Sequence, residues 1–247
     1  MKVKRFRDLT FIEQENDKYL VIACDSSGAI GDKVDDVIKV PAEIVGYYAA
    51  RVALMEILSV GAKVFTVIDT LAVEMEPTGR KIIDGIQRQL KEAGMEAILL
   101  NGSTEENIPT RQTGMGITII GEVDKNQAKI NKSQKGDYVV VLGIPKVGNE
   151  INIPVDNEIC SIDDIKTLLN SKVVREIYPV GSKGILYEAN YLAKSNNMTL
   201  KIYEKLKVDI EKSGGPATIL IFTISPEDYE KIRKNIDKPL EIIGELI

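Results

Sequence analysis

Several acidic residues stand where strand-like segments begin or end, a pattern that could build a metal site. Asp8 precedes the run LTFIE, Asp25 follows YLVIA, and Glu105 and Glu106 follow AILL after four intervening residues. Strand ends can converge on one cleft, where several carboxylates repel one another unless a divalent cation neutralises them. The pattern is therefore typical of a magnesium-phosphate site. Taken singly, each of these residues is more typical of a cap or a solvated loop, so both interpretations stay open.

The segment NGSTEENIPT, residues 101–110, carries more oxygen atoms than a turn requires. It follows an apolar run and leads into a second strand-like run, GMGITIIGEV. Gly102 and Pro109 would suffice to form a turn, yet the segment also carries hydroxyls, amides and two adjacent carboxylates. This excess makes the loop a candidate for a functional site.

Glu56 is a further candidate because it lies inside a strongly apolar helical segment, VALMEILSV. A glutamate in that setting either lies on the solvent side of a broad apolar face or is turned toward a polar cleft. The sequence leaves both alternatives open.

Other catalytic chemistries are excluded by what the chain lacks. It has no histidine, which removes Ser-His-Asp, Cys-His and His-zinc sites and leaves oxygen ligands for any metal, as magnesium or calcium prefer. Neither a G-x-x-x-x-G-K-[ST] loop nor a G-x-G-x-x-G fingerprint occurs. Cys24 and Cys160 cannot form a disulfide framework or a zinc site, and packing is their expected role.

Composition narrows the class of protein. The chain has 247 residues, 44% hydrophobic and 28% charged, values typical of a globular protein with one large domain or two modest ones. The net charge of −5 disfavours nucleic acid and anionic membranes as partners. No stretch approaches the roughly 20 apolar residues of a membrane span. We expect a cytoplasmic protein.

The apolar periodicity predicts an alternation of strands and helices. Helical spacing is clearest over 41–62, with Pro41 near its start and Gly61 near its end, and a second amphipathic helix is predicted over 77–94 with Gly94 as its stop. Strands are predicted at 19–24, 63–73, 97–100 and up to 123. Beyond the polar segment 124–135, the expected elements are strands at 137–145 and 217–225 and helices at 161–171, 181–197 and from Pro226 onward.

These segments resemble the AIR synthase-related superfamily, which includes thiamine-monophosphate kinase and aminoimidazole ribonucleotide synthetase. The stretch VALMEILSVGAKV is similar to the superfamily helix pattern N-x-L-S-D-I-x-A-M-G-A-x-P, with Glu56 at the metal-binding aspartate and Val52 at the asparagine. The run NGST is similar to the G-G-x-T loop beside the ATP phosphates, with Gly102 and Thr104 in register. FRDLTFIE and IACD resemble two further acidic motifs, which place Asp8 and Asp25 on metal-binding aspartates.

The resemblance implies a set of site residues. They are Asp8, Asp25, Glu56 and Glu105 as magnesium ligands, and Gly102, Ser103 and Thr104 as contacts to ATP phosphates.

The second half resembles the superfamily more loosely. PVGSKGI is similar to D-I-S-D-G-L, but Lys183 stands where the family has an aspartate, and a lysine there would bring positive charge toward phosphate. A solvated helix start is an equally good interpretation of Lys183. The resemblance implies catalytic roles for Asp25 and Lys183 and a phosphate-binding role for Lys183.

The sequence therefore predicts an α/β protein with the two-domain AIR synthase-like fold. The domains are 1–123, with a mixed sheet that forms a barrel with a second copy in a homodimer, and 136–247, a smaller α/β domain after a linker over 124–135. The expected function is Mg-ATP-dependent phosphoryl transfer to a small-molecule acceptor, with α-ribazole kinase as one possibility. The alternatives are a non-catalytic ATP-binding regulatory protein and an ATP-dependent synthetase that activates an amide or carbonyl oxygen.

Overall fold

A computed structural model describes residues 1–153 and 155–247, which divide into two compact units. The first unit comprises Met1–Leu58 and Ala62–Ala128, and the second comprises Ser59–Gly61 and Lys129–Ile247. Each unit has its own sheet, so each is described by itself. The domain limits 1–123 and 136–247 stay a prediction.

The first unit is built on a six-stranded sheet with the order β1-β2-β3-β8-β6-β7. Neighbouring strands are antiparallel except β6 and β7, which are parallel. The strands are β1 (Val3–Phe6), β2 (Leu9–Glu13), β3 (Lys18–Gly28), β6 (Lys63–Leu71), β7 (Leu99–Thr104) and β8 (Gly114–Asp124). A short parallel pair, β4 (Ile30–Gly31) with β5 (Ile38–Lys39), follows β3.

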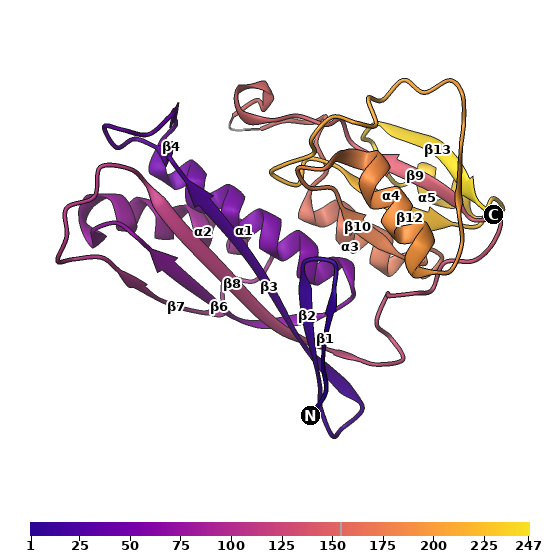
Figure 1. Cartoon of the computed structure of the whole chain (residues 1–247), viewed down its shortest axis with the longest axis horizontal. Helices are drawn as coiled ribbons and strands as arrows, with labels where there is room; N and C mark the ends of the chain where they lie inside the picture. Colours follow the sequence, from indigo (N-terminus) through magenta and orange to yellow (C-terminus); the bar gives the residue numbers. More distant parts are fainter. Residues whose placement is uncertain (154) are drawn as a thin grey trace. The chain divides into compact units, whose positions relative to one another are not determined.

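Two helices, α1 (Ala42–Ser59) and α2 (Arg80–Glu92), cover one face of this sheet (Figure 1). They approach closely at two glycines: a Cβ on Gly46 would lie 2.0 Å from the carbonyl oxygen of Ile82, and a Cβ on Gly85 would lie 1.9 Å from that of Glu43. Gly61 and Gly94 follow the two helices with φ of +80° and +65°, which confirms their predicted role as stops. A separate wide turn, η1 (Met75–Gly79), precedes α2 and occupies the start of the predicted helix.

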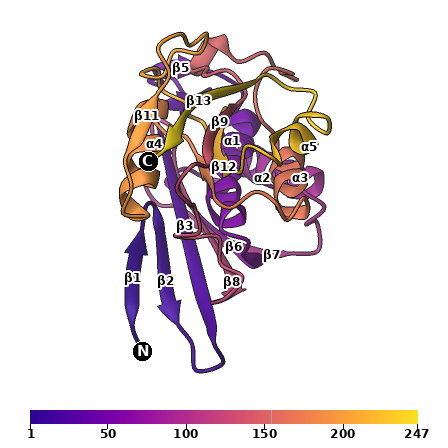
Figure 2. The same cartoon turned by 90° about the vertical axis from the view of Figure 1, so that its right-hand side faces the viewer.

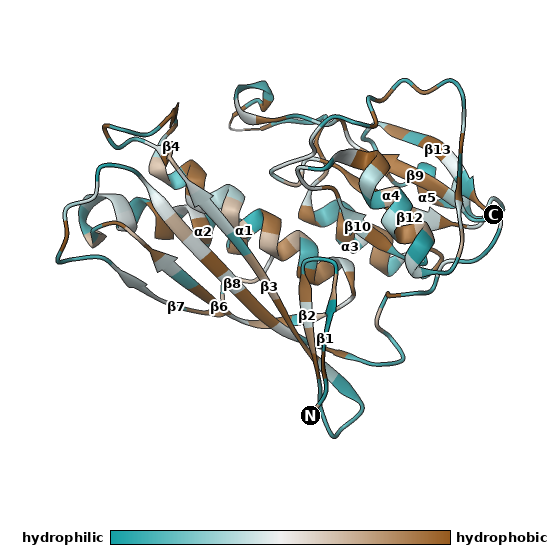
Figure 3. Ribbon diagram, viewed as in Figure 1, coloured by the Kyte–Doolittle hydropathy of each residue, from teal (hydrophilic) through white to brown (hydrophobic). Residues whose placement is uncertain are grey.

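The two faces of the first sheet differ in burial. On β3, Tyr19, Val21 and Ala23 are buried, whereas the alternating Leu20 and Ile22 are only partly covered. Apolar residues nevertheless run along much of β3, β6 and β8 (Figure 3). The odd-numbered positions of β3 therefore face the helices, and the even-numbered positions form an uncovered face that is partly apolar.

The second unit contains a five-stranded antiparallel sheet with the order β10-β12-β9-β13-β11 (Figure 2). The strands are β9 (Tyr138–Leu142), β10 (Ile177–Pro179), β11 (Leu200–Ile202), β12 (Leu220–Ile224) and β13 (Leu240–Leu246). The central strands β9 and β12 are almost wholly buried, as their continuous apolar runs predict. Its helices are α3 (Ile162–Asn170), α4 (Gly184–Ser195), α5 (Tyr229–Arg233) and the short turn η2 (Gly148–Glu150).

The C-terminal segment differs from the sequence-based expectation. The helix predicted from Pro226 is reduced to the five residues of α5, and the last residues form β13, which pairs with β9 about 100 positions earlier. Pairing of β13 on both sides, with β9 and β11, satisfies its backbone groups. Among the described residues, no helix is long and apolar enough to cross a membrane.

Candidate functional site

Strand pairing in the first sheet brings two aspartates into one row. Asp25 on β3 lies opposite Ile117 on β8, Ile117 lies opposite Asp69 on β6, and Asp69 lies opposite Gly102 on β7. Paired residues share a face of the sheet, and Ile117 is buried, so this row lies on the helix-covered face. From the spacing of strands, Asp25 and Asp69 are about 10 Å apart. The row therefore joins the predicted metal ligand Asp25 to the predicted phosphate-binding Gly102.

Asp25 has the electrostatics expected of a functional carboxylate. Burial, opposed by a hydrogen bond from the backbone of Ser26 and assisted by the nearby charge of Asp8, raises its pKa from 3.8 to about 6. Asp8 itself is exposed, with its carboxylate 3.6 Å from the guanidinium of Arg5. The structure thus brings Asp8 and Asp25 close enough to repel each other, which a bound cation would relieve.

Asp69 is a site candidate that the sequence reasoning missed. The residue is only 3% exposed. Burial raises its pKa to about 6. A signal was present in the run VFTVIDTL, because Asp69 has the same parity as the buried Val67 and Leu71. A charged residue at an inward strand position points to a ligand or a buried partner.

Gly102 is shaped around the Asp69 carboxylate. A Cβ on Gly102 would lie 2.2 Å from Oδ1, 2.4 Å from Cγ and 2.6 Å from Oδ2 of Asp69. Any other residue at this position would force the carboxylate aside. Gly102 is itself exposed, so the Asp69 carboxylate lies directly beneath the surface of the loop.

Glu56 is paired with a basic residue, and its role as a metal ligand stays a prediction. Its carboxylate accepts two hydrogen bonds from the guanidinium of Arg7, at 3.0 Å to Oε2 and 3.3 Å to Oε1. Both side chains are buried, at 4% and 9% exposure. Arg7 lies in the β1–β2 turn with φ +51°, a position that local sequence patterns do not connect to α1. A buried, two-fold ion pair holds Glu56 in a structural role.

The segment 101–110 is not a loop throughout, because residues 101–104 are the end of β7, and the carboxylates that follow the strand make local hydrogen bonds. Glu105 Oε1 accepts from the backbone N–H of Asn107 at 2.8 Å. Glu106 Oε1 accepts from the Thr104 hydroxyl at 2.7 Å and from the backbone N–H of Met75 at 2.8 Å. Ser103 is exposed on β7 beside Gly102. The glycine and the serine hydroxyl remain open to a ligand, whereas both carboxylates shape the loop.

Lys183 lies in the second unit, immediately before α4. Its ammonium group is 3.2 Å from the hydroxyl oxygen of Tyr187 and 4.3 Å from the centre of that ring. The side chain is exposed and therefore free to turn toward an anion. Its role at the phosphates stays a prediction.

The four predicted metal ligands do not gather at one point. Across residues 1–153 and 155–247, no three Asp, Glu, Cys or His side chains form a group that could hold a metal ion. Asp8 and Asp25 are neighbours, Glu56 pairs with Arg7, and Glu105 bonds within its own loop. A bound cation would need phosphate oxygens to complete its coordination.

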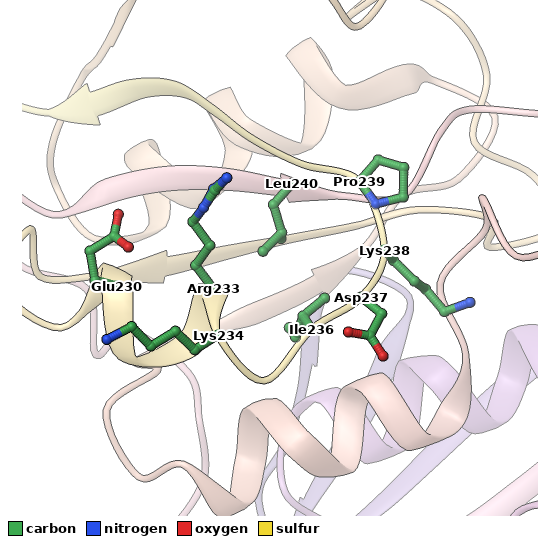
Figure 4. A pocket seen from close by; sticks show the side chains of 8 residues that line it. All are labelled: Glu230, Arg233, Lys234, Ile236, Asp237, Lys238, Pro239 and Leu240. Atoms are coloured by element: carbon green, nitrogen blue, oxygen red, sulfur yellow. The ribbon is translucent and has the colours of Figure 1, made fainter.

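A surface hollow of about 630 Å³ in the second unit contains none of the predicted site residues (Figure 4). It lies between α5 and the segment that leads into β13, and its charged rim includes Arg233, Asp237 and Lys238. Charges of both signs line it, so it has no evident preference for an anion or a cation.

Comparison with known proteins finds one family model that matches most of the first unit. Residues 7–123 match the family model described as AIR synthase related protein, N-terminal domain. No curated protein sequence matches the chain.

Solved structures extend the likeness to both units. Thiamine monophosphate kinase from Aquifex aeolicus matches with a TM-score of 0.68 and 16% identity, over 98% of this chain and 89% of the kinase. AaThiL complexed with AMPPCP and TMP matches with a TM-score of 0.65 and 17% identity, over 97% and 84%. T. maritima PurL complexed with ATP gives 0.66 and 15%, over 96% of this chain but only 42% of PurL. At these identities the likeness establishes the α/β AIR synthase-like fold.

Proposed function

Residues 7–123 belong to the AIR synthase related family through its N-terminal domain, and from this premise we propose that the protein transfers phosphoryl groups from Mg-ATP to a small acceptor. The observation that carries the proposal is the row from Asp25 to Gly102, which begins beside Asp8 and ends at the exposed Gly102 of the edge strand β7. ATP or AMPPCP is named in the complexes of PurL and AaThiL.

The residues of the first unit fit a magnesium-bound nucleotide. Asp8 and Asp25 are neighbouring carboxylates that repel each other when no cation is present, and oxygen donors suit magnesium. Bound magnesium would supply charge neutralisation at the phosphate oxygens. The backbone N–H of Gly102 and the hydroxyls of Ser103 and Thr104 would orient those oxygens.

Two further predicted residues belong to the proposed site. Glu105 keeps its second carboxylate oxygen, Oε2, for a cation, because the backbone N–H groups of Asn107 and Ile108 both bond to Oε1. Lys183 of the second unit would bring positive charge to the transferred phosphoryl group. Catalysis of this kind depends on positioning and charge neutralisation, so the absence of histidine is no obstacle.

A thermal-stability titration tests the nucleotide site. We expect millimolar Mg-ATP to raise the Tm of the wild-type protein, and Asp25→Asn to weaken nucleotide affinity by about 10–100-fold in the presence of magnesium. Asp84→Asn, which alters an exposed carboxylate of α2, is the matched control and should bind like the wild type. A wild-type Tm that does not respond to Mg-ATP would contradict the proposal.

Assays of ATP consumption with different acceptors distinguish a kinase from a synthetase and from a regulatory ATP-binding protein. ATP consumption that requires a small alcohol or phosphate, with thiamine monophosphate and α-ribazole among the acceptors tried, would support the kinase. Consumption only in the presence of an amine or amide donor would favour the synthetase. Binding without consumption in any mixture would favour a regulatory ATP-binding protein.

We also propose a homodimer formed through the uncovered face of the first sheet. Leu20, Ile22, Ile68 and Ile120 are partly exposed on this face, and Leu99 on the edge strand β7 is 68% exposed. A contiguous apolar surface of this kind is typical of a protein interface. Light scattering at micromolar concentration should give twice the chain mass of 27.3 kDa, and a monomer mass would contradict this proposal.

A further inference from the structure

The turn between β1 and β2 consists of only two residues, Arg7 and Asp8, because Phe6 on one strand pairs with Leu9 on the other. Arg7 has a φ of +51°, in the left-handed region that favours glycine. In two-residue hairpin turns, positions with positive φ are usually occupied by glycine, asparagine or aspartate. An arginine there strains the backbone, which points to a use for its side chain.

The Arg7 side chain fastens this turn to helix α1. Its guanidinium donates to both carboxylate oxygens of Glu56, at 3.0 Å and 3.3 Å. The two side chains are only 4% and 9% exposed, so water competes little for these bonds. Two bonds between planar groups fix orientation as well as distance. The pair therefore fixes the tip of the β1–β2 hairpin relative to α1.

The same tip carries Asp8 to the level of Asp25. Leu9 pairs with Ala23 on β3, so Asp8, the residue before Leu9, lies near Asp25, two positions further along β3. The electrostatic interaction between the two carboxylates agrees with this placement. Because Asp8 directly follows Arg7 in a two-residue turn, its position depends on where the arginine is held.

Other contacts hold the body of the hairpin. Phe6, Leu9 and Phe11 are at most 8% exposed, and β2 pairs with β3 over the whole of Leu9–Glu13. Removal of the Arg7–Glu56 pair as a whole should therefore leave the hairpin in place and loosen only its tip. The pair is neutral, so its removal also changes the net charge near Asp25 by nothing.

We propose that Arg7 and Glu56 are positioning residues that hold Asp8 close enough to Asp25 for both carboxylates to bind one divalent cation. The proposal rests on the proposed nucleotide site, in which Asp8 and Asp25 bind magnesium. Glu56 acts through Arg7 and does not touch the cation. This role also explains why a backbone position suited to glycine carries an arginine.

Cation affinity in a stable variant tests the proposal. The probe is Mn²⁺ in the presence of AMPPCP, measured by electron paramagnetic resonance. In Arg7→Met with Glu56→Leu, which keeps most of the buried volume, we expect Mn²⁺ to bind about tenfold more weakly than in the wild type. Glu56→Gln, which keeps one acceptor oxygen for Arg7, should give an intermediate affinity. Wild-type affinity in the double variant would overturn the proposal.

A thermodynamic cycle with Asp8→Asn separates positioning from a general structural role. Asp8→Asn should weaken Mn²⁺ binding about tenfold in the wild-type background. In the background of Arg7→Met with Glu56→Leu it should weaken binding by less than about twofold, because a displaced Asp8 no longer reaches the cation. Independent effects would instead multiply to about a hundredfold loss, and that result would overturn the proposal. Asp84→Asn, the matched control, should bind like the wild type.

The single variant Arg7→Met distinguishes positioning from direct ligation by Glu56. If Glu56 were a ligand, removal of the guanidinium would free its carboxylate and tighten Mn²⁺ binding. Positioning predicts weaker binding, measured below the Tm of the variant. Tighter binding would overturn the proposal.

Failure of this inference is distinguishable from failure of the proposed function. A wild-type protein that binds no AMPPCP at any Mn²⁺ concentration would overturn both. A wild-type protein that binds AMPPCP and Mn²⁺ no more tightly than Arg7→Met with Glu56→Leu would overturn only the role of Arg7 and Glu56.

Discussion

Replacement of Glu56 by alanine is expected to lower the free energy of unfolding by about 3–5 kcal/mol, the usual cost of breaking a buried ion pair from one side. The Arg7 guanidinium would remain 96% buried and lose the carboxylate that accepts from both of its terminal nitrogens. Urea denaturation at neutral pH, with the midpoint and slope fitted together, measures this loss.

A double variant provides the control for this prediction. Arg7→Met with Glu56→Leu removes both charges and keeps most of the buried volume, so its stability should lie much closer to that of the wild type. If Glu56 were only a metal ligand, Glu56→Ala would lose Mg-ATP binding with little loss of stability in EDTA. That result would contradict a structural role and support the role predicted from the sequence.

Replacement of Asp69 by asparagine should raise the free energy of unfolding in EDTA by on the order of 1–3 kcal/mol at pH 7.5. Burial raises the pKa of Asp69 to about 6 from 3.8. A group whose pKa is raised on folding binds its proton more tightly in the folded state, so its ionisation destabilises the fold as pH rises from about 4 to 6. Asparagine, which is neutral at every pH, escapes that destabilisation.

The pH dependence is the sharper part of this prediction. The stability difference between Asp69→Asn and the wild type should be near zero at about pH 4, grow through pH 6 and stay constant above it. Asp25 titrates over the same range, but it is present in both proteins, so its contribution cancels in the difference. Urea denaturation at half-unit pH intervals measures the profile. A difference that does not vary with pH, or that is largest in acid, would show that Asp69 is stabilised as an anion.

Local sequence patterns were sufficient to predict the helices α1 and α2 and the resemblance to the AIR synthase-related superfamily. The apolar spacing of α1 and α2 and the glycines at 61 and 94 predicted both helices and their ends, because periodicity and positive φ are properties of a few neighbouring residues. The resemblance of VALMEILSVGAKV to a family helix led to the fold that the comparisons support. The start of α2 and the C-terminal strand β13 were not foreseen, since the separate turn η1 and a pairing with the distant β9 leave no local pattern.

The candidate site was predictable only in part. The types of Asp8, Asp25, Gly102 and Ser103 suggested a magnesium-phosphate site because several carboxylates and hydroxyls stand together at strand ends, although each acidic residue alone is more typical of a cap or a solvated loop. Their sequence positions, however, carried no information on which carboxylates would already have a partner in the folded chain.

The tertiary structure determines which carboxylates have a partner in the folded chain. Arg7 neutralises Glu56 from 49 residues away, and strand register places Asp69 over Gly102, which lies 33 positions later in the chain. Types and spacing of residues determine local conformation and the chemistry that is available. Which charges meet, and which remain buried without a partner, depends on the pairing of distant strands, because contact energies act through space and not along the chain.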